Sequence, residues 1–267
     1  MQTLVPTYKD LILIGGGHSH ALVLKMWAMK PLPGVRLTLI SPQVLTPYSG
    51  MLPGLIAGHY ALEETHIDLS RLCRYANAHF IQASVTGIDL SNKEITFTDR
   101  SPLGFDLLSI NSGISPDLRI PGAADFAIPV KPIAEFYPRW LSIKNDLCRQ
   151  GILANHKEPY RIAIVGGGAA GVELILAMHF SLSTDTTINR ALQFCLVQQG
   201  EGLPENYPTR LQRKVGELFA RLDIDVIANT RVEAVSANTL KGENNKTLHF
   251  DCLFWCTNAS AAAWLKE

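Results

Sequence analysis

Short apolar runs and amphipathic stretches alternate along this chain, and the alternation begins with one compact unit. Residues 11–14 are wholly apolar, which is typical of a strand buried on both faces of a parallel sheet. We therefore predict a strand over 10–15 and a helix over about 18–30, which Pro31, Pro33 and Gly34 end. Residues 35–40, closed by Ser41-Pro42, predict the next strand. The first 40 residues thus predict a strand–helix–strand unit.

The second half of the chain repeats this succession. We predict a strand over 161–165, a helix over 169–181 and a strand over 192–198. Each half also closes with an aspartate and an apolar strand that ends in small polar residues, at 106–113 and 251–258. This internal repeat predicts two homologous α/β folds.

The intervening segments give the other expected elements. Residues 114–131 are rich in proline and predict a connector with a domain boundary near 114–130, and residues 46–60 predict an apolar loop rich in glycine and proline. The remaining predictions are helices over 65–77, 132–150 and 205–221, a hairpin over 88–98 turning at Ser91-Asn92, and strands over 79–85, 105–111, 224–228, 231–236, 247–250 and 251–257.

A glycine-rich turn follows the first strand of each half, at Gly15–Gly17 and at Gly166–Gly171. Glycines let the backbone approach a pyrophosphate, and the free N–H groups of the following helix attract its charge. One such turn indicates a nucleotide. Two in one chain indicate two dinucleotides, held so that a nicotinamide can pass a hydride to a flavin.

Composition narrows the function further. Apolar residues are 47% of the 267 and charged residues 18%, so the chain can bury a core. The formal net charge is zero, which argues against nucleic acid as a partner. The five cysteines form no CxxC or zinc pattern, so we expect no metal site. Cys252 and Cys256 fall on one side of a strand, where we expect two small buried apolar side chains. The absence of a secretory signal and of a long apolar segment predicts a cytoplasmic protein without a membrane span.

The segments Gly15–His20, Thr46–Gly54 and Val130–Pro132 together resemble the pyridine nucleotide–disulfide oxidoreductase superfamily, in its type II NADH dehydrogenase-like branch. They are most similar to the flavoprotein module that some bacteria fuse to selenide, water dikinase. The resemblance covers nearly the whole chain. It implies two Rossmann-like folds of the three-layer ββα type, with a nicotinamide domain inserted in an FAD domain.

This resemblance implies FAD in residues 1–118, NAD(P)H in residues 119–258, and the start of a return to the FAD domain in 259–267. A Gly-Asp turn that would contact the flavin is expected after this return and is missing from the sequence, as is the usual glycine at Asn258. We therefore expect a truncated or degenerate chain. Because residues 42–60 contain no cysteine, we reject disulfide reduction.

Several departures from the dinucleotide fingerprint affect the expected sites. His20 stands where the third glycine of the first turn is usual, and we expect the helix to lie slightly further out there. Ser41 replaces the acidic residue that would bind a ribose in the first half. In the second half Gln198 and Gln199 replace both that acid and the arginine that would favour a 2′-phosphate, and we expect NADH rather than NADPH. The expected cofactor-binding residues are Gly15, Gly16, Gly17, His18, Ser19, His20, Ser41, Tyr48, Ser49, Gly50, Met51, Val85, Gly113, Gly166, Gly167, Gly168, Ala169, Ala170, Gly171 and Gln198.

Two residues are candidates for catalysis. We expect Glu173 in the first turn of its helix, where it either stabilises the helix dipole or, as the resemblance implies, lies near the nicotinamide–flavin contact. Lys131 either stabilises negative charge on reduced flavin or is a solvated lysine of the connector. The histidines at 18 and 20 either pack near the pyrophosphate or act in catalysis.

The leading hypothesis is an FAD-dependent NAD(P)H oxidoreductase that passes electrons to a quinone or another small acceptor. A non-catalytic nucleotide-binding or regulatory module is the alternative, favoured by His20, Ser41 and Asn258. A sulfide:quinone-type oxidoreductase is third, because four of the five cysteines fall in the second half or its approach. A homodimer and peripheral contact with the inner face of a membrane, through an absent C-terminal part, stay open.

Overall fold

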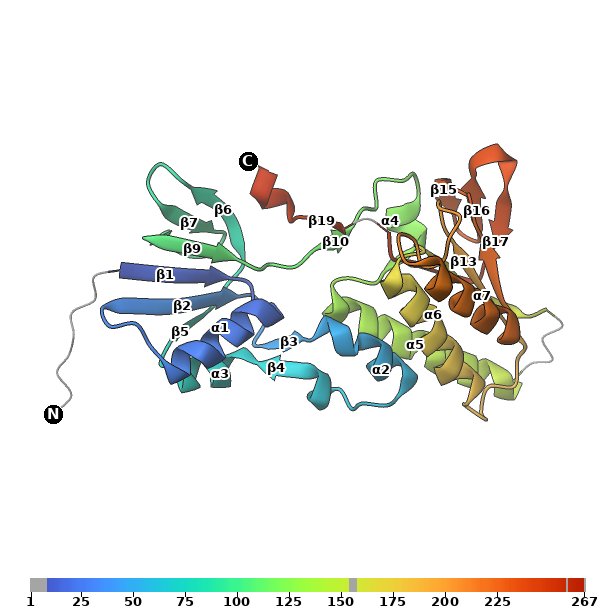
Figure 1. Ribbon diagram of the computed structural model, residues 1–267, viewed down its shortest axis with the longest axis horizontal. Coiled ribbons are helices and arrows are strands. Elements are labelled where there is room, and N and C mark those ends of the chain that lie inside the picture. Colours follow the sequence, from blue (N-terminus) through green and yellow to red (C-terminus); the bar gives the residue numbers. More distant parts are fainter. Residues whose placement is uncertain (1–8, 154–157, 258, 267) are drawn as a thin grey trace. The chain divides into compact units, whose positions relative to one another are not determined.

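The computed structural model describes residues 9–153, 158–257 and 259–266 and forms two compact units (Figure 1). The first unit takes the chain up to Tyr48, then Leu62–Ile114, and the last segment from Ala261. The second takes Ser49–Ala61 and Ser115–Ser260. Part of the range expected for the first domain, Ser49–Ala61, thus packs within the second unit. Asn258 lies outside the described residues.

A parallel sheet of order β5-β2-β1-β9 is the middle layer of the first unit. Alternate residues of its apolar strands face opposite sides. Leu13 shares a buried cluster with residues of helices α1 and α3, whereas Ile12 shares one with Ile95 of an antiparallel sheet. These are the three layers that the sequence predicts. The elements are β1 (Lys9–Ile14), α1 (His18–Met29), β2 (Val35–Ser41), β3 (Leu45–Pro47), η2 (Glu63–Thr65), β4 (His66–Asp68), α3 (Leu69–Tyr75), β5 (His79–Gln82), β6 (Val85–Asp89), β7 (Glu94–Phe97), β8 (Leu103–Gly104), β9 (Leu107–Ile110) and η4 (Ala263–Lys266).

The second unit has a parallel sheet of order β11-β18-β12-β13-β14. One face packs against helices through a cluster that includes Phe136, Trp140 and Phe219, and the other against α4 and a three-stranded sheet through Val235 and Leu240. The elements are η1 (Ser49–Met51), α2 (Leu52–Ala57), β10 (Ser115–Pro116), α4 (Ala123–Phe126), β11 (Ile128–Pro129), α5 (Ile133–Leu153), β12 (Tyr160–Val165), α6 (Ala169–Ser183), β13 (Leu192–Val197), α7 (Thr209–Arg221), β14 (Ile224–Ile227), β15 (Val232–Ser236), β16 (Thr239–Gly242), η3 (Glu243–Asn245), β17 (Thr247–His249), β18 (Cys252–Trp255) and β19 (Ala259–Ser260).

The internal repeat is present in the strand pairing. In the first unit β1 lies between β2 and β9, and in the second β12 lies between β13 and β18, all parallel. Because the carboxyl ends of parallel strands share one edge, the glycine turns after β1 and β12 each lie at that edge of their own sheet. The two units therefore present equivalent turns in equivalent surroundings.

Several predicted elements differ from the structure. The expected loop at 46–60 contains helix α2. Pro53 is compatible with this helix because it lies in the first turn, where a backbone N–H has no partner within the helix. Gly58 ends the helix in a left-handed conformation. The expected helix at 65–77 begins only at Leu69, where the Asp68 side chain caps it. The predicted connector holds α4 and two short strands, and β16 was not predicted.

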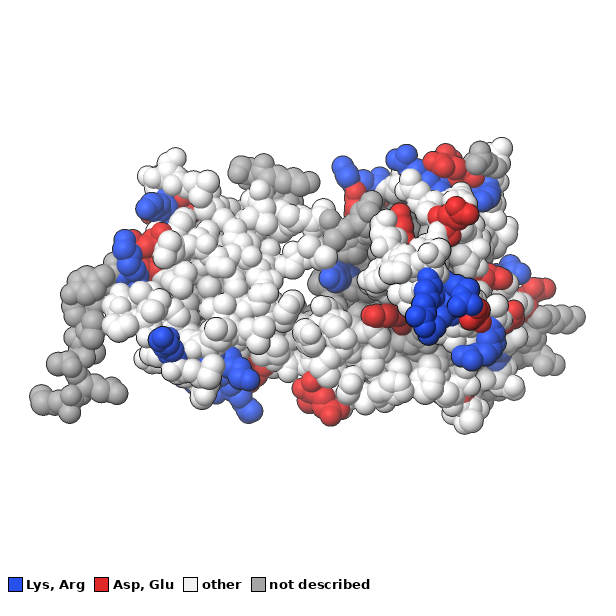
Figure 2. All heavy atoms as spheres, in the orientation of Figure 1, with Lys and Arg blue, Asp and Glu red and all other residues white. Residues whose placement is uncertain are grey.

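The surface has no dominant charge. On the face shown in Figure 2, basic and acidic side chains are interspersed. Among the described residues, no helix is both long enough and apolar enough to cross a bilayer.

Candidate functional site

The first glycine turn is held closely against the end of β9. Gly15 has a φ of +92°, and a Cβ atom on it would overlap the carbonyl oxygen of Asn111. A Cβ on Gly17 would overlap the Asn111 side chain. A larger residue at Gly15 would therefore meet the Asn111 backbone, and one at Gly17 would displace the Asn111 side chain.

The helix after this turn starts without a cap. Gly17 is the N-cap residue of α1, no side chain accepts from its first amides, and the described first turn has no acidic residue. By contrast, the Asp68 side chain accepts from the Arg71 amide at the start of α3. Uncapped amides at a helix start carry partial positive charge and bind anions. The start of α1 therefore offers an anion site of the kind that a pyrophosphate occupies.

His20 is buried behind the turn, with 2% of its surface exposed. Its Nδ1 lies 2.7 Å from the Gly15 carbonyl oxygen and its Nε2 lies 2.9 Å from Ser109 Oγ. Because a carbonyl only accepts, Nδ1 carries the proton and donates to Gly15. Burial lowers the pKa of His20 against the opposing effect of the Gly15 carbonyl, so the ring is neutral. Both nitrogens are engaged within the protein, and any effect of His20 on a ligand acts through the backbone.

The other expected residues of the first unit lie around the same edge of the sheet. Ser41 ends β2 and its hydroxyl bonds to Gln43. Val85 and Gly113 follow the carboxyl ends of β5 and β9, and Gly113 has open space around it. The ring of exposed His18 meets that of Tyr48 edge-on at 5.7 Å between centroids, and Ser19 is also exposed.

The second turn keeps the third glycine. Gly166 has a φ of +128°, and a Cβ on it would lie 2.9 Å from the Cys256 carbonyl oxygen. A Cβ on Gly171 would overlap the Gly166 carbonyl oxygen, whereas Gly168 has nothing within 4 Å. Gly168 is the N-cap of α6, whose first two residues are Ala169 and Ala170. Like α1, this helix has no capping side chain and no acidic residue in its described first turn. The turn is tight on the protein side and open at Gly168.

Gln198 lies against this turn. It directly follows β13, is 2% exposed, and occupies the place that a Cβ on Gly167 would take. Its Nε2 donates to the carbonyls of Glu201 and Gly202, which fixes the amide orientation. Its Oε1 is buried without a hydrogen-bond partner in the described part of the chain. An unpaired buried acceptor is costly, so this oxygen needs a donor that the described residues do not supply.

Both candidate catalytic residues lie in the second unit. Glu173 is exposed on α6, which starts at Ala169 as predicted. It is the fifth residue of the helix and belongs to the second turn, so the expectation of a first-turn acid is wrong. Lys131 precedes Pro132, and its charge acts on the thiol of Cys256 at the end of β18. Burial outweighs that charge and raises the pKa of Cys256 to about 11.

Cys252 and Cys256 both pack on the helix-covered side of the sheet. Cys252 is buried in the core cluster there, as expected, whereas Cys256 is only partly buried and packs against that cluster. Burial raises the pKa of Cys252 to about 12 and that of Cys73 to about 11. Thiols held protonated in this way are poor nucleophiles.

The expected cofactor-binding residues Tyr48, Ser49, Gly50 and Met51 divide between the units. Ser49, Gly50 and Met51 form η1 and lead into α2, whose contacts are with α6 in the second unit. Gly54 lies under the ring of Tyr60, which occupies the place of a Cβ. Gly54 is thus a packing position and not an open approach for a ligand.

Sequence reasoning missed the residues that support the turns from the closing strand. Asn111 contacts Gly15 and Gly17, Ser109 bonds to His20, and Cys256 lies behind Gly166. The sequence signal that could have found these supporting residues is the internal repeat, because β9 and β18 are both followed by small or polar residues beside a glycine turn.

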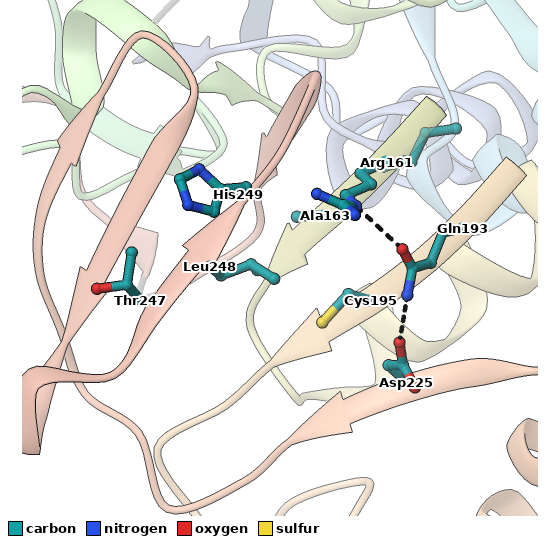
Figure 3. A pocket seen from close by; sticks show the side chains of 9 residues that line it. Arg161, Ala163, Gln193, Cys195, Asp225, Thr247, Leu248 and His249 are labelled. Atoms are coloured by element: carbon teal, nitrogen blue, oxygen red, sulfur yellow. Dashed lines mark hydrogen bonds between the residues drawn. The ribbon is translucent and has the colours of Figure 1, made fainter. Parts of the chain in front are cut away.

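A separate cavity of about 190 Å³ lies at the amino ends of the strands in the second unit (Figure 3). Arg161 Nε donates to Gln193 Oε1, and Gln193 Nε2 donates to Asp225, so a polar ladder crosses β12, β13 and β14. From β17, Leu248 points toward this ladder, and His249 also lines the cavity. The glycine turn is at the opposite, carboxyl end of these strands, so this cavity is not part of that site.

The three-layer folds and the paired glycine turns define a Rossmann-like α/β protein. The family model described as "Pyridine nucleotide-disulphide oxidoreductase" matches residues 9–263, and the chain belongs to that family.

Two curated relatives and one solved structure are similar to the chain. It is 26% identical over 253 residues to NADH dehydrogenase-like protein YutJ of Bacillus subtilis, covering 92% of this chain and 64% of that protein. It is 22% identical to external NADH-ubiquinone oxidoreductase 2 of Saccharomyces cerevisiae, covering 93% and 49%. NDH2 from Plasmodium falciparum, solved in complex with NADH, has a TM-score of 0.85 at 22% identity, covering 97% and 56%.

The chain therefore spans 49–64% of the length of these proteins. The narrower resemblance to the module fused to selenide, water dikinase stays a prediction, because these proteins do not test it.

Proposed function

We propose that this chain is the nucleotide-binding part of an FAD-dependent NAD(P)H oxidoreductase, with FAD at the first glycine turn and NAD(P)H at the second. One observation carries the proposal: each unit has an uncapped helix start directly after a glycine turn that packs closely against the end of the neighbouring strand. The names of the two curated relatives, both NADH dehydrogenase-like or NADH-ubiquinone oxidoreductases, support it.

The residues present fit two dinucleotides. A pyrophosphate must approach the backbone closely, and both turns lead through closely packed glycines into an uncapped helix start, with open space beside Gly168 in the second. In the first unit, Gly15–Ser19 would hold the pyrophosphate, with Ser41 toward the ribose and Tyr48, Val85 and Gly113 along the rest of the cofactor. In the second, Gly166–Gly171 would take the same role.

The chemistry that these groups supply when bound is hydride transfer from a nicotinamide to a flavin, and electron transfer from there to a small acceptor such as a quinone. The chain contributes binding, orientation and charge. Glu173, an exposed carboxylate on the helix after the second turn, and Lys131, a cation beside the end of β18, are the groups we assign to charge and orientation at the reacting end.

Gln198 supports NADH as the preferred nucleotide. The buried Oε1 of Gln198 lacks a donor among the described residues, and the ribose 2′-hydroxyl of NADH would supply one. The extra 2′-phosphate that replaces this hydroxyl in NADPH is mainly an acceptor at pH 7. Glu201 and Glu205 flank the same loop, and the Glu205 amide donates to the Gly167 carbonyl. Their carboxylates add repulsion toward an extra phosphate. We therefore propose tighter binding of NADH than of NADPH.

Anaerobic titration tests the proposal. Protein mixed with FAD and freed of excess flavin should be yellow, and NADH should then bleach the flavin absorbance. Gly15→Ala should abolish flavin retention but keep NADH binding. Gly171→Ala should abolish NADH binding but keep flavin retention. Gly216→Ala, in open space on α7, is the matched control and should behave as wild type.

The outcomes separate the alternatives. NADH binding without flavin retention would support a non-catalytic nucleotide-binding module instead. Bleaching by sulfide but not by NADH would support a sulfide:quinone-type reaction, which the raised pKa values of the buried cysteines disfavour. Reoxidation of the bleached protein by a short-chain quinone would support a quinone as the acceptor. Sedimentation of the protein with vesicles and its mass in solution would test the expected peripheral membrane contact and homodimer.

A further inference from the structure

The two glycine turns solve one packing problem in different ways. In each turn a carbonyl, of Gly15 or Gly166, points toward the residue five positions later in the following helix. In the second unit that residue is Gly171, which leaves room for the carbonyl only because it has no Cβ. In the first unit it is His20, whose Nδ1 donates to the carbonyl at 2.7 Å.

The neighbouring strand has changed together with the helix. Ser109 pairs with Leu13 in the first unit, and Phe254 pairs with Ile164 in the second, so the two occupy the same register position. Ser109 Oγ lies 2.9 Å from His20 Nε2 and, with the ring neutral, donates to it. A polar pair, His20 and Ser109, thus stands where the second unit has Gly171 and Phe254.

We propose that His20, held by Ser109, is a positioning residue that fixes the first glycine turn for dinucleotide binding in place of the missing third glycine. This inference rests on the proposed function of the first turn. The hydrogen bond to Gly15 fixes the peptide that leads into Gly16 and Gly17, while Asn111 restrains the same turn from its other side. The amides at the start of α1 are then preorganised for a pyrophosphate without contact between the imidazole and the ligand.

The side-chain amide of asparagine provides the test, because its nitrogen occupies the position of imidazole Nδ1, whereas that of glutamine occupies the position of Nε2. FAD affinity, measured by flavin fluorescence at pH 7.5, should fall about tenfold in His20→Leu and His20→Gln, as expected for one lost buried hydrogen bond. The FAD affinity of His20→Asn should stay within about threefold of wild type, because the asparagine amide keeps the hydrogen bond to the Gly15 carbonyl. Ser109→Ala should weaken FAD binding in the wild-type background but have no effect in the His20→Asn background.

Binding of NADH at the second turn is the internal control and should be the same in all variants. Wild-type FAD affinity in His20→Leu would overturn the proposal, as would an equal loss in His20→Asn and His20→Leu. Loss of NADH binding together with FAD binding in His20→Leu would also overturn it, because the residue would then support the whole fold.

A second measurement does not depend on flavin. The ¹⁵N spectrum of His20 should show a protonated Nδ1, and the Gly16 and Gly17 amides should exchange about tenfold faster in His20→Leu than in wild type. If wild-type protein retained no FAD, the proposed function would fail while these spectra still decided the positioning role. Unchanged amide exchange would refute that role.

Discussion

Gly168→Ala should separate ligand binding from folding. Gly168 has an extended backbone (φ −73°, ψ 174°) that any residue adopts, and a Cβ there meets no protein atom within 4 Å. The substitution also restricts the unfolded chain, which stabilises a protein by about 0.4–1 kcal/mol at compatible sites. We therefore expect a stability equal to or slightly above that of wild type.

NADH binding should respond in the opposite direction. The open space beside Gly168 adjoins the uncapped amides of α6, which is where a pyrophosphate would lie. A methyl group there keeps the phosphates from the backbone, and loss of one charge-assisted hydrogen bond of about 1.5–3 kcal/mol corresponds to an affinity at least tenfold weaker.

Urea unfolding and calorimetric titration with NADH measure the two quantities on the same preparation. Gly216→Ala is the control, since it also adds a methyl group in open space, on α7, but far along the chain from either turn. It should raise stability by about 0.5–1 kcal/mol as a helix substitution and leave NADH affinity unchanged. If Gly168→Ala bound NADH as tightly as wild type, the second turn would not be the pyrophosphate site.

Three other predictions concern stability. Gly171→Ala should lower the unfolding free energy by about 1–3 kcal/mol, measured in urea, because its Cβ overlaps the Gly166 carbonyl and α6 must shift. Phe136→Ala should lower it by about 3–5 kcal/mol, since a fully buried ring is removed from the larger core cluster; a smaller loss would mean that the site collapses. Burial lowers the pKa of His20 from its ordinary value of 6.5. As the pH falls through that value, the unfolded chain therefore binds a proton before the folded chain does, and the unfolding free energy should fall. His20→Asn should reduce that slope between pH 7.5 and 5.5, and urea unfolding across this pH range measures it.

Much of the fold was predictable because its strongest signals are local. Wholly apolar runs such as residues 11–14 and 162–165 are short, end in glycines and precede helical periodicity, so their strands were found to within one or two residues. Helix α2 was missed because its sequence carries Pro53 and Gly54, and only packing against α6 makes it helical.

The candidate site was predictable at its turns but not in its supports. A glycine pattern shows where backbone must come close, but not what it comes close to. That Asn111 restrains Gly15, or that Ser109 bonds to His20, depends on contacts about 90 residues apart in the chain. Gln198 was expected to face a ribose, and its burial under residues 201–202 follows from a loop conformation that no local pattern indicates.

The course of the chain between the two units limits how the protein can be dissected. Residues Ser49–Ala61 belong with Ser115–Ser260, although the chain on both sides of them belongs elsewhere. A fragment cut at Ser115 would lose Leu55 and Ile56 and expose the apolar side of α6 that they cover. Neither unit corresponds to a single uninterrupted stretch of the gene, so a deletion series has to keep Ser49–Ala61 together with Ser115–Ser260.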